Sequence, residues 1–211
     1  MEVKETNSGW LHRGGRKTRT SRPRHRLPGL AVDVLVLLIL LVGGRPILGQ
    51  GNAASEYEVK AAFLYHFSQF VDWPEGTFKE AKSPIVYCTL GEDPFHGALE
   101  ASLSGKAVGE RALRVQHFKQ LEEIRGCQIL FIGEGKQKRA ASLATQLQGN
   151  PVLTVGESEH FIQEGGMIGF LFEENKIRFE VNLDAAEHAK LKLSSRLLGL
   201  AKRVIGGRRG N

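Results

Sequence analysis

The amino-acid sequence predicts an α/β fold: a three-layer sandwich of flavodoxin-like or Rossmann-like plan, with a mostly parallel sheet and an antiparallel hairpin at one edge. Two observations lead to this class. Three short apolar runs, at residues 84–90, 127–132 and 151–155, alternate with helical patterns. Two later segments alternate apolar and polar residues around a short turn. Since strands separated by helices form parallel sheets with both faces covered, we expect two buried sheet faces.

Residues 1–54 are expected to be a secretory signal peptide. Residues 1–29 carry eight Lys or Arg, an apolar run of 13 residues follows at Leu30–Val42, and small residues come next. This layout predicts cleavage between about Gly49 and Ala54, because the apolar run is shorter than the ~20 residues of a membrane span. The protein is therefore expected to be exported; the alternative is an uncleaved leader that anchors it in the membrane.

The net charge of +6 belongs to this leader. Residues 1–50 contain nine Lys or Arg and three Asp or Glu, whereas residues 51–211 contain 20 of each. A neutral mature domain lacks the basic surface that binds nucleic acid or anionic lipid. The composition therefore argues against both as partners.

Residues 55–205 are expected to form one domain, followed by a solvated tail at 206–211. Its first element is a helix over Ser55–Val71, with a capping box of Ser55 and Glu58 and a stop at Trp73-Pro74. The elements expected next are strand 84–90, helix 95–103, strand 112–118, short helix 119–125, strand 127–132, helix 136–148, strand 151–155 and a helical turn at 158–163.

The last third of the chain has a different pattern. Met167–Phe172 and Lys176–Asn182 alternate apolar and polar residues, which predicts an antiparallel hairpin around Glu173–Asn175. A long helix over Asp184–Val204 is expected to close the domain. Its apolar stripe would be Ala186, Ala189, Leu193, Leu197, Leu200 and Val204.

Motif searches favour a protein without catalytic activity. Gly133-Glu134-Gly135-Lys136 stands between a strand and a helix, but it lacks the spacing and the Ser or Thr of a phosphate-binding loop. There is no Gly-x-Ser-x-Gly elbow and no Cys-x-x-Cys pair, and the histidines of the mature part stand at no metal-ligand spacing. We therefore expect no catalytic residues, no metal and no cofactor.

Carboxylates follow three of the expected parallel strands, at Glu92, Glu134 and Glu157. Ligands of open α/β sheets bind beyond the carboxyl ends of the strands, so these residues are candidates for the mouth of a ligand site. Their charge disfavours phosphates and dinucleotides and would suit a cation. The alternative is that they are ordinary turn residues on a solvated rim.

Cys88 and Cys127 are the two cysteines of the chain, and they stand on different expected strands. In an oxidising compartment, two cysteines of one exported domain usually pair, which predicts a disulfide. The alternative is two buried free thiols, because both residues stand in apolar runs.

Several motifs resemble the YfiR-like periplasmic proteins, in the same order. They are Glu58–Phe67 (EVKAAFLYHF), Phe70–Pro74 (FVDWP), Val152–Gly156 (VLTVG), Gly165–Ile168 (GGMI), Arg178–Asn182 (RFEVN) and Leu191–Leu198 (LKLSSRLL). The resemblance covers essentially all of residues 56–205.

The resemblance implies a regulator and not an enzyme. In that family, a periplasmic repressor binds the inner-membrane diguanylate cyclase YfiN, keeps the synthesis of cyclic-di-GMP low and forms a homodimer. Cys88 and Cys127 fall where one family cysteine pair is expected. The family's second pair would lie within Ile162–Gly169, which has no cysteine here, so redox sensing by that pair does not carry over to this chain.

A partner-binding protein should present large apolar side chains. The first helix and the segment after it offer Phe63, Phe67, Phe70 and Trp73 as anchors for the periplasmic part of a membrane signalling protein. The alternative is that all four lie in the core. A second function class, a periplasmic small-molecule-binding module, would instead show a closed pocket at the strand ends.

Overall fold

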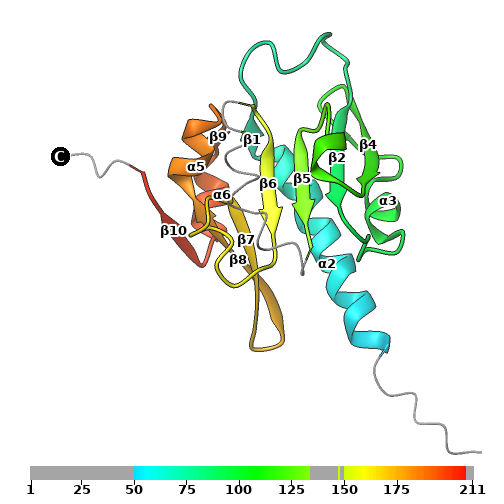
Figure 1. The fold of residues 1–211 in the computed structure, drawn as a ribbon, viewed down its shortest axis with the longest axis vertical. Coiled ribbons are helices and arrows are strands. Elements are labelled where there is room, and N and C mark those ends of the chain that lie inside the picture. Colours follow the sequence, from blue (N-terminus) through cyan, green and yellow to red (C-terminus); the bar gives the residue numbers. More distant parts are fainter. Residues whose placement is uncertain (1–49, 134–146, 148–149, 208–211) are drawn as a thin grey trace, which may run out of the picture. The chain divides into compact units, whose positions relative to one another are not determined.

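The computed structural model describes residues 50–133, 147 and 150–207, and Figure 1 shows their fold. Residues 1–49 of the expected signal peptide, nearly all of the expected helix 136–148, and residues 208–211 lie outside the described part. No helix within the described part is long and apolar enough to cross a membrane.

An eight-stranded sheet, ordered β10-β8-β7-β6-β5-β2-β4-β3, forms the centre of the domain. Its five central strands run parallel, and their order in the sheet is second, first, third, fourth and fifth along the chain. This is the flavodoxin-like strand order, so the predicted α/β class with a mostly parallel sheet is confirmed. The five strands are β2 (Ile85–Leu90), β4 (Arg111–Phe118), β5 (Ile129–Ile132), β6 (Leu153–Gly156) and β7 (Ile168–Glu173).

The predicted hairpin is present, but it does not form the edge of the sheet. β7 and β8 (Lys176–Asn182) pair antiparallel around Glu174 and Asn175, whose positive φ angles of 49° and 60° suit a two-residue hairpin turn. β10 (Arg203–Ile205) adds in parallel outside β8. At the other edge, β3 (Ala107–Val108) pairs antiparallel with β4.

One face of the sheet is covered by α2 (Gln50–Gln69) and α3 (Ala98–Leu103), which lie behind and beside the central strands in Figure 1. The helix predicted over Ser55–Val71 is present, but it starts earlier and runs through Ser55, so the predicted capping box is wrong. It ends before Trp73 because β1 (Val71–Asp72) leaves the helix to pair with β9 (Lys192–Leu193).

The opposite face carries a second apolar cluster that includes Cys88, Leu130 and Phe161. The short helix predicted at 119–125 is a single 3₁₀ turn, η1 (Leu121–Glu123). Phe161 packs against Gly156 and Gly166 so closely that a Cβ atom at either glycine would lie within 2.5 Å of its ring. Residues at these two positions must therefore be glycine.

The long helix predicted over Asp184–Val204 is wrong. The segment forms α5 (Leu183–His188), β9, α6 (Ser195–Leu200) and β10. α5 ends because Lys190 has a left-handed φ of 58°, and α6 begins anew because the Ser194 hydroxyl accepts a hydrogen bond from the Leu197 N–H. Of the predicted stripe, Leu200 and Val204 are exposed. The expected tail at 206–211 is held at its start, since the Gly207 N–H donates to Asp184.

Candidate functional site

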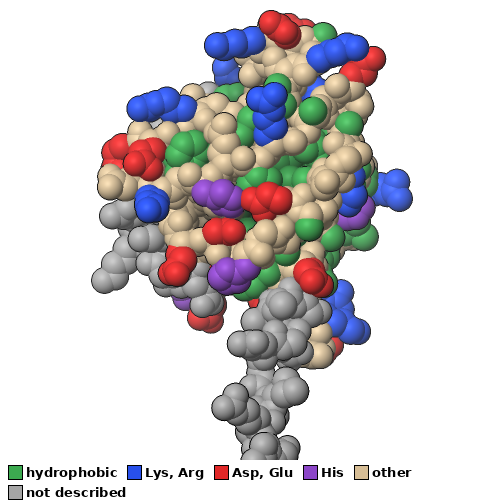
Figure 2. Space-filling model, turned by 90° about the vertical axis from the view of Figure 1, so that its right-hand side faces the viewer, with side chains coloured by type: hydrophobic (Ala, Val, Ile, Leu, Met, Phe, Trp, Pro, Cys, Tyr) green, Lys and Arg blue, Asp and Glu red, His purple; other side chains and the backbone are tan. Residues whose placement is uncertain are grey.

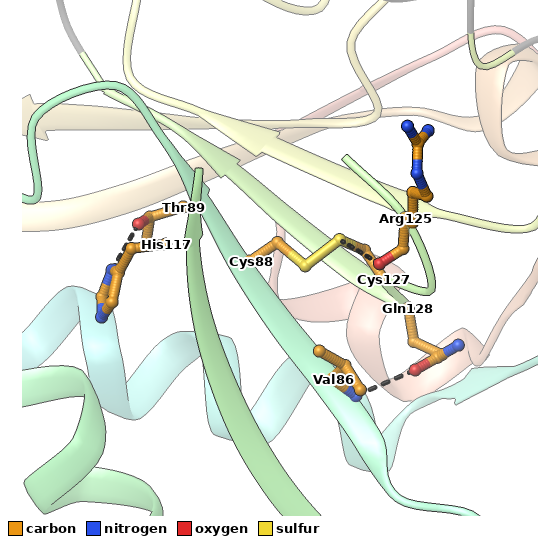
Figure 3. The surroundings of a disulfide bond; sticks show 7 residues. All are labelled: Val86, Cys88, Thr89, His117, Arg125, Cys127 and Gln128. Atoms are coloured by element: carbon orange, nitrogen blue, oxygen red, sulfur yellow. Dashed lines mark hydrogen bonds between the residues drawn. A yellow bond between two sulfur atoms is a disulfide. The ribbon is translucent and has the colours of Figure 1, made fainter. Parts of the chain in front are cut away.

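Cys88 and Cys127 form a disulfide, as predicted, and both are buried. Figure 3 shows the bond joining β2 to the residues just before β5, and the two Cα atoms lie 5.9 Å apart. Beside it, the Gln128 side-chain oxygen accepts a hydrogen bond from the Val86 N–H. The disulfide and this hydrogen bond fasten β2 to the start of β5 on the face opposite α2.

A hydroxyl, an imidazole and a carboxylate form a series on the other side of β2. His117 Nδ1 lies 2.7 Å from Thr89 Oγ1, and His117 Nε2 lies 2.7 Å from Glu100 Oε1 (Figure 3 labels the first two residues). The arrangement resembles a hydrolase triad, but Thr89 is only 1% exposed. Because no substrate can approach a buried hydroxyl, these contacts join β2, β4 and α3 and do not form a nucleophilic site.

The carboxyl ends of the strands carry a buried ion pair. Lys60 Nζ of α2 lies 2.5 Å from Glu157 Oε2, which follows β6, and 2.6 Å from Glu56 Oε1. The Lys60 and Glu157 side chains are only 6% and 4% exposed. The Tyr57 hydroxyl donates to Glu157, and the Lys60 ammonium lies 4.4 Å from the centre of the Tyr57 ring.

The Lys60–Glu157 ion pair bears on the three carboxylates that the sequence offered as the mouth of a ligand site. Glu157 lies at the carboxyl ends of the strands, as expected, but Lys60 compensates its charge. Glu92 is exposed, and Glu134 lies outside the described residues. No group of three or more His, Cys, Asp or Glu side chains in the described part could hold a metal ion. Sequence reasoning missed Lys60, although a lysine within the apolar pattern of a helix was a usable signal.

The four aromatic anchors expected in and after the first helix differ in exposure. Phe67 is 1% exposed and packs against Phe170 and Phe179, so its expected role as an interface anchor is wrong and it belongs to the core. Phe63 and Phe70 are half-buried, and Trp73 lies half-buried against Phe78. Only these three retain surface that a partner could reach.

Four large apolar side chains are exposed within the described residues. They are Val59, Phe172, Leu200 and Val204, which we term the apolar edge. Phe172 and Val204 lie on β7 and β10, the two strands that pair with β8, whereas Leu200 lies on α6 and Val59 on α2 (Figure 1 shows these elements). The sequence pattern placed Phe172 on the apolar face of a strand and Leu200 and Val204 on the apolar stripe of a helix. Periodicity indicates which residues share a face but not how far other elements cover that face.

The opposite part of the molecule has a mixed surface. Figure 2, which looks at the side of α3 and β4, shows positive and negative side chains interspersed with apolar ones. No large field of one sign covers this face. It gives a polyanion no continuous basic surface to bind, in agreement with the neutral charge of residues 51–211.

A cleft of about 570 Å³ lies at the amino ends of β5 and β6, at the end of the sheet opposite to Glu157. Four separate segments line it: Pro74–Thr77, Ile124–Gln128, Leu147 with Asn150–Val152, and Lys190. Cys127 of the disulfide contributes to its wall. No pattern in the sequence predicted this cleft, because its lining residues come from segments that are far apart along the chain.

Two comparisons with known proteins bear on these features. The model of a protein family described as YfiR/HmsC-like matches residues 57–202. Among solved structures, a conserved domain protein of Vibrio cholerae O1 biovar El Tor is similar, with 10% sequence identity and a TM-score of 0.45. That match covers 71% of this chain and 60% of the Vibrio chain, so it spans less than two thirds of that protein's length.

Proposed function

Because this chain belongs to the YfiR/HmsC-like family, we propose that it is an exported regulator that binds and represses a membrane signalling enzyme. The partner is the periplasmic part of an inner-membrane diguanylate cyclase, and binding lowers the concentration of cyclic-di-GMP. The family match over residues 57–202 carries this proposal, since it spans nearly all of the folded domain.

The physical features of the domain support a role in binding. Residues 51–211 carry no net charge, and the Cys88–Cys127 disulfide suits the oxidising periplasm. The triad-like series at His117 has its hydroxyl buried, so it offers no accessible nucleophile. A repressor of this kind acts by stoichiometric contact and needs no catalytic group.

The contact surface in this proposal is the apolar edge, together with Phe63 and Phe70. Phe172 and Leu200 are 57% and 64% exposed, which is unusual for side chains of this size in a domain with a well-filled core. Interfaces are enriched in large apolar groups, and a few such anchors usually dominate the binding energy. This assignment replaces the buried Phe67 with side chains that a partner can reach.

Deletion of the gene tests the proposed function directly. In cells that lack the protein, cyclic-di-GMP should rise, and an affinity-tagged copy should co-purify with a membrane-anchored cyclase from detergent extracts. A deletion strain with unchanged cyclic-di-GMP, together with no co-purifying membrane protein, would overturn the proposal. A periplasmic small-molecule-binding module would then be the better account, since the cleft beside Cys127 offers a site.

Export and assembly are part of the same proposal. Sequencing the amino terminus of periplasmic material should give a start between Gly49 and Ala54, and a chain that still begins at Met1 contradicts cleavage.

Light scattering on the purified protein should report a homodimer. A monomer at micromolar concentration would remove the homodimer from the proposal without affecting repression.

A further inference from the structure

The geometry points to a ligand site that is separate from the apolar edge: we propose that the cleft at the amino ends of β5 and β6 binds a small organic anion with an apolar body. Such a molecule carries a carboxylate or phosphate group on a ring or a short hydrocarbon chain. This inference goes beyond repression of a membrane partner and does not depend on it.

The volume and the apolar lining of the cleft suit a ligand of this kind. Its volume of about 570 Å³ falls within the ~300–1,000 Å³ of small-molecule sites. Apolar side chains contribute part of the wall: Cys127 and Val152 stand just before β5 and β6, Ile124 follows η1, and Pro74 and Pro151 come from loops. Such a wall removes an apolar group from water, which supplies binding energy without fixing its orientation.

The charges at the cleft favour an anionic head group. Arg125 and Lys190 line the cleft and are exposed, and neither forms a salt bridge with another described residue. Among the described residues that line the cleft, Glu75 is the one with a negative charge. The described part of the lining therefore carries a net charge of +1 from two cations and one carboxylate, which disfavours a cationic ligand. Arg and Lys both bind carboxylate and phosphate oxygens with charge-assisted hydrogen bonds.

The backbone at Lys190 is a second, independent observation. α5 ends in a Schellman motif, in which the Leu191 N–H donates to the Ala186 carbonyl and the Lys190 N–H donates to the Glu187 carbonyl. Residue 190 must then be left-handed, and its φ is 58°. Glycine is usual at this position because it adopts the left-handed region without strain. A lysine here is strained, and strained residues cluster at ligand sites.

Phenyl phosphate and benzoate are suitable probes, with inorganic phosphate and cyclohexylamine as comparisons. Titration calorimetry on the purified protein should detect both aromatic anions with dissociation constants below about 1 mM. Inorganic phosphate should bind more weakly because it lacks the apolar body, and cyclohexylamine should not bind because it carries the opposite charge. Comparing the dissociation constants of phenyl phosphate and benzoate also shows which head group the cleft prefers.

Lys190→Gly separates ligand binding from stability. It should weaken phenyl phosphate binding by about tenfold while leaving the thermal midpoint unchanged or higher, because glycine relieves the left-handed strain. Asn175→Gly is the matched control, since Asn175 is also left-handed but lies on the β7–β8 turn, away from the cleft. It should leave binding unchanged. Arg125→Gln should weaken binding as Lys190→Gly does.

Three results would overturn the proposal. They are no heat of binding for either aromatic anion up to about 10 mM, equal binding of cyclohexylamine, or unchanged affinity in both the Lys190→Gly and the Arg125→Gln variants. Since Lys190→Gly is expected to fold at least as well as the parent, loss of affinity in it cannot come from unfolding.

Discussion

Lys60 illustrates how one side chain can fix the position of a whole helix. Its ammonium group is buried between the carboxylates of Glu56 and Glu157, at the point where α2 crosses the end of β6. Two charges taken out of water gain little net stability when paired, but removing one of them leaves the other uncompensated. The pair therefore specifies where α2 lies more than it strengthens the fold.

Replacing Lys60 should reveal this asymmetry. Lys60→Met is expected to lower the free energy of unfolding by about 3–5 kcal/mol, and adding Glu157→Leu should restore part of the loss. Urea denaturation measures both. Lys82→Ala is the matched control, because the Lys82–Glu110 pair spans 3.7 Å between exposed side chains and should change stability by less than about 1 kcal/mol. A Lys60→Met variant as stable as the control would contradict the assignment.

Tyr87 links the buried face of β2 to α2 and makes the stability of the protein depend on pH. Its hydroxyl donates to Ser68 Oγ at 2.6 Å, and Ser68 in turn donates to the Tyr65 carbonyl. Burial raises the pKa of the Tyr87 hydroxyl above its ordinary value, and the hydrogen bond with Ser68 offsets part of that effect. The folded state therefore holds this proton at pH values at which the unfolded chain releases it.

The sign of the resulting stability change follows from this difference. Below pH 10 both states keep the proton, so Tyr87 has no effect on the pH dependence. Above pH 10 only the unfolded chain loses the proton, and the free energy of unfolding should fall by about 1.4 kcal/mol per pH unit. Urea denaturation between pH 9 and 11 should give a free energy of unfolding that falls above pH 10 in the parent and falls less steeply there in Tyr87→Phe. Equal slopes in the two proteins would rule out Tyr87 as the source.

Among the elements, β2 and β5 depend on a covalent link. Cys88 and Cys127 are 39 residues apart in the sequence. A disulfide that closes a loop of this length lowers the conformational entropy of the unfolded chain and so raises its free energy by about 4 kcal/mol. Cys88→Ser should therefore lower the free energy of unfolding by about 2–4 kcal/mol and reduce the amount of protein in the periplasm. Cys127→Ser should have the same effect, because either change breaks the same bond.

Peptide mapping without reductant checks the premise of that prediction. It should recover the Cys88 and Cys127 peptides as one linked species. Two alkylatable thiols in periplasmic protein would show that the bond does not form there, and the stability losses of the two variants would then need another cause.

The strands were predictable because their signals are local. β2, β5 and β6 are short apolar runs, and the β7–β8 hairpin alternates around a turn, so each pattern lies within a few neighbouring residues. The segment after β8 was mispredicted for the opposite reason. Its apolar residues have helical spacing, but β9 pairs with β1 and β10 pairs with β8. Those partners lie elsewhere in the chain and override local propensity.

Among the candidate sites, too, the features that depend on local sequence were predicted, and those that depend on contacts between distant segments were not. The disulfide and the position of Glu157 followed from strand order and from the number of cysteines, which are properties of the sequence pattern. The pairing of Glu157 with Lys60 required knowing that α2 crosses the end of β6. The cleft depends on how four loops meet, and no periodicity encodes that meeting.

At the scale of the whole molecule, the features that could serve function are segregated. The apolar edge lies on the elements around β8, whereas the cleft opens at the amino ends of β5 and β6. The buried ion pair lies at the opposite, carboxyl end of the same strands. A partner protein and a small anion would therefore use different surfaces, so variants in one region can be tested without changing the other.

The partner surface can be tested because substitutions of exposed and of buried apolar residues should have different effects on stability and on binding. Phe172→Ser and Leu200→Ser should each change the free energy of unfolding by less than about 0.5 kcal/mol, because both side chains are mostly exposed. Each should weaken binding to the membrane partner by about tenfold or more and raise cyclic-di-GMP in the cell. Phe67→Ala should instead lower stability by about 3–5 kcal/mol, because Phe67 packs in the core.

Thermal denaturation and partner affinity must be measured on the same preparations of these variants. A loss of repression in Phe67→Ala that follows its loss of folded protein would reflect unfolding, whereas a loss in Phe172→Ser at unchanged stability would locate the interface. If Phe172→Ser and Leu200→Ser both retain full affinity and full repression, the apolar edge does not bind the partner. The half-buried Phe63 and Phe70 would then be the next positions to test, because both keep part of their surface accessible.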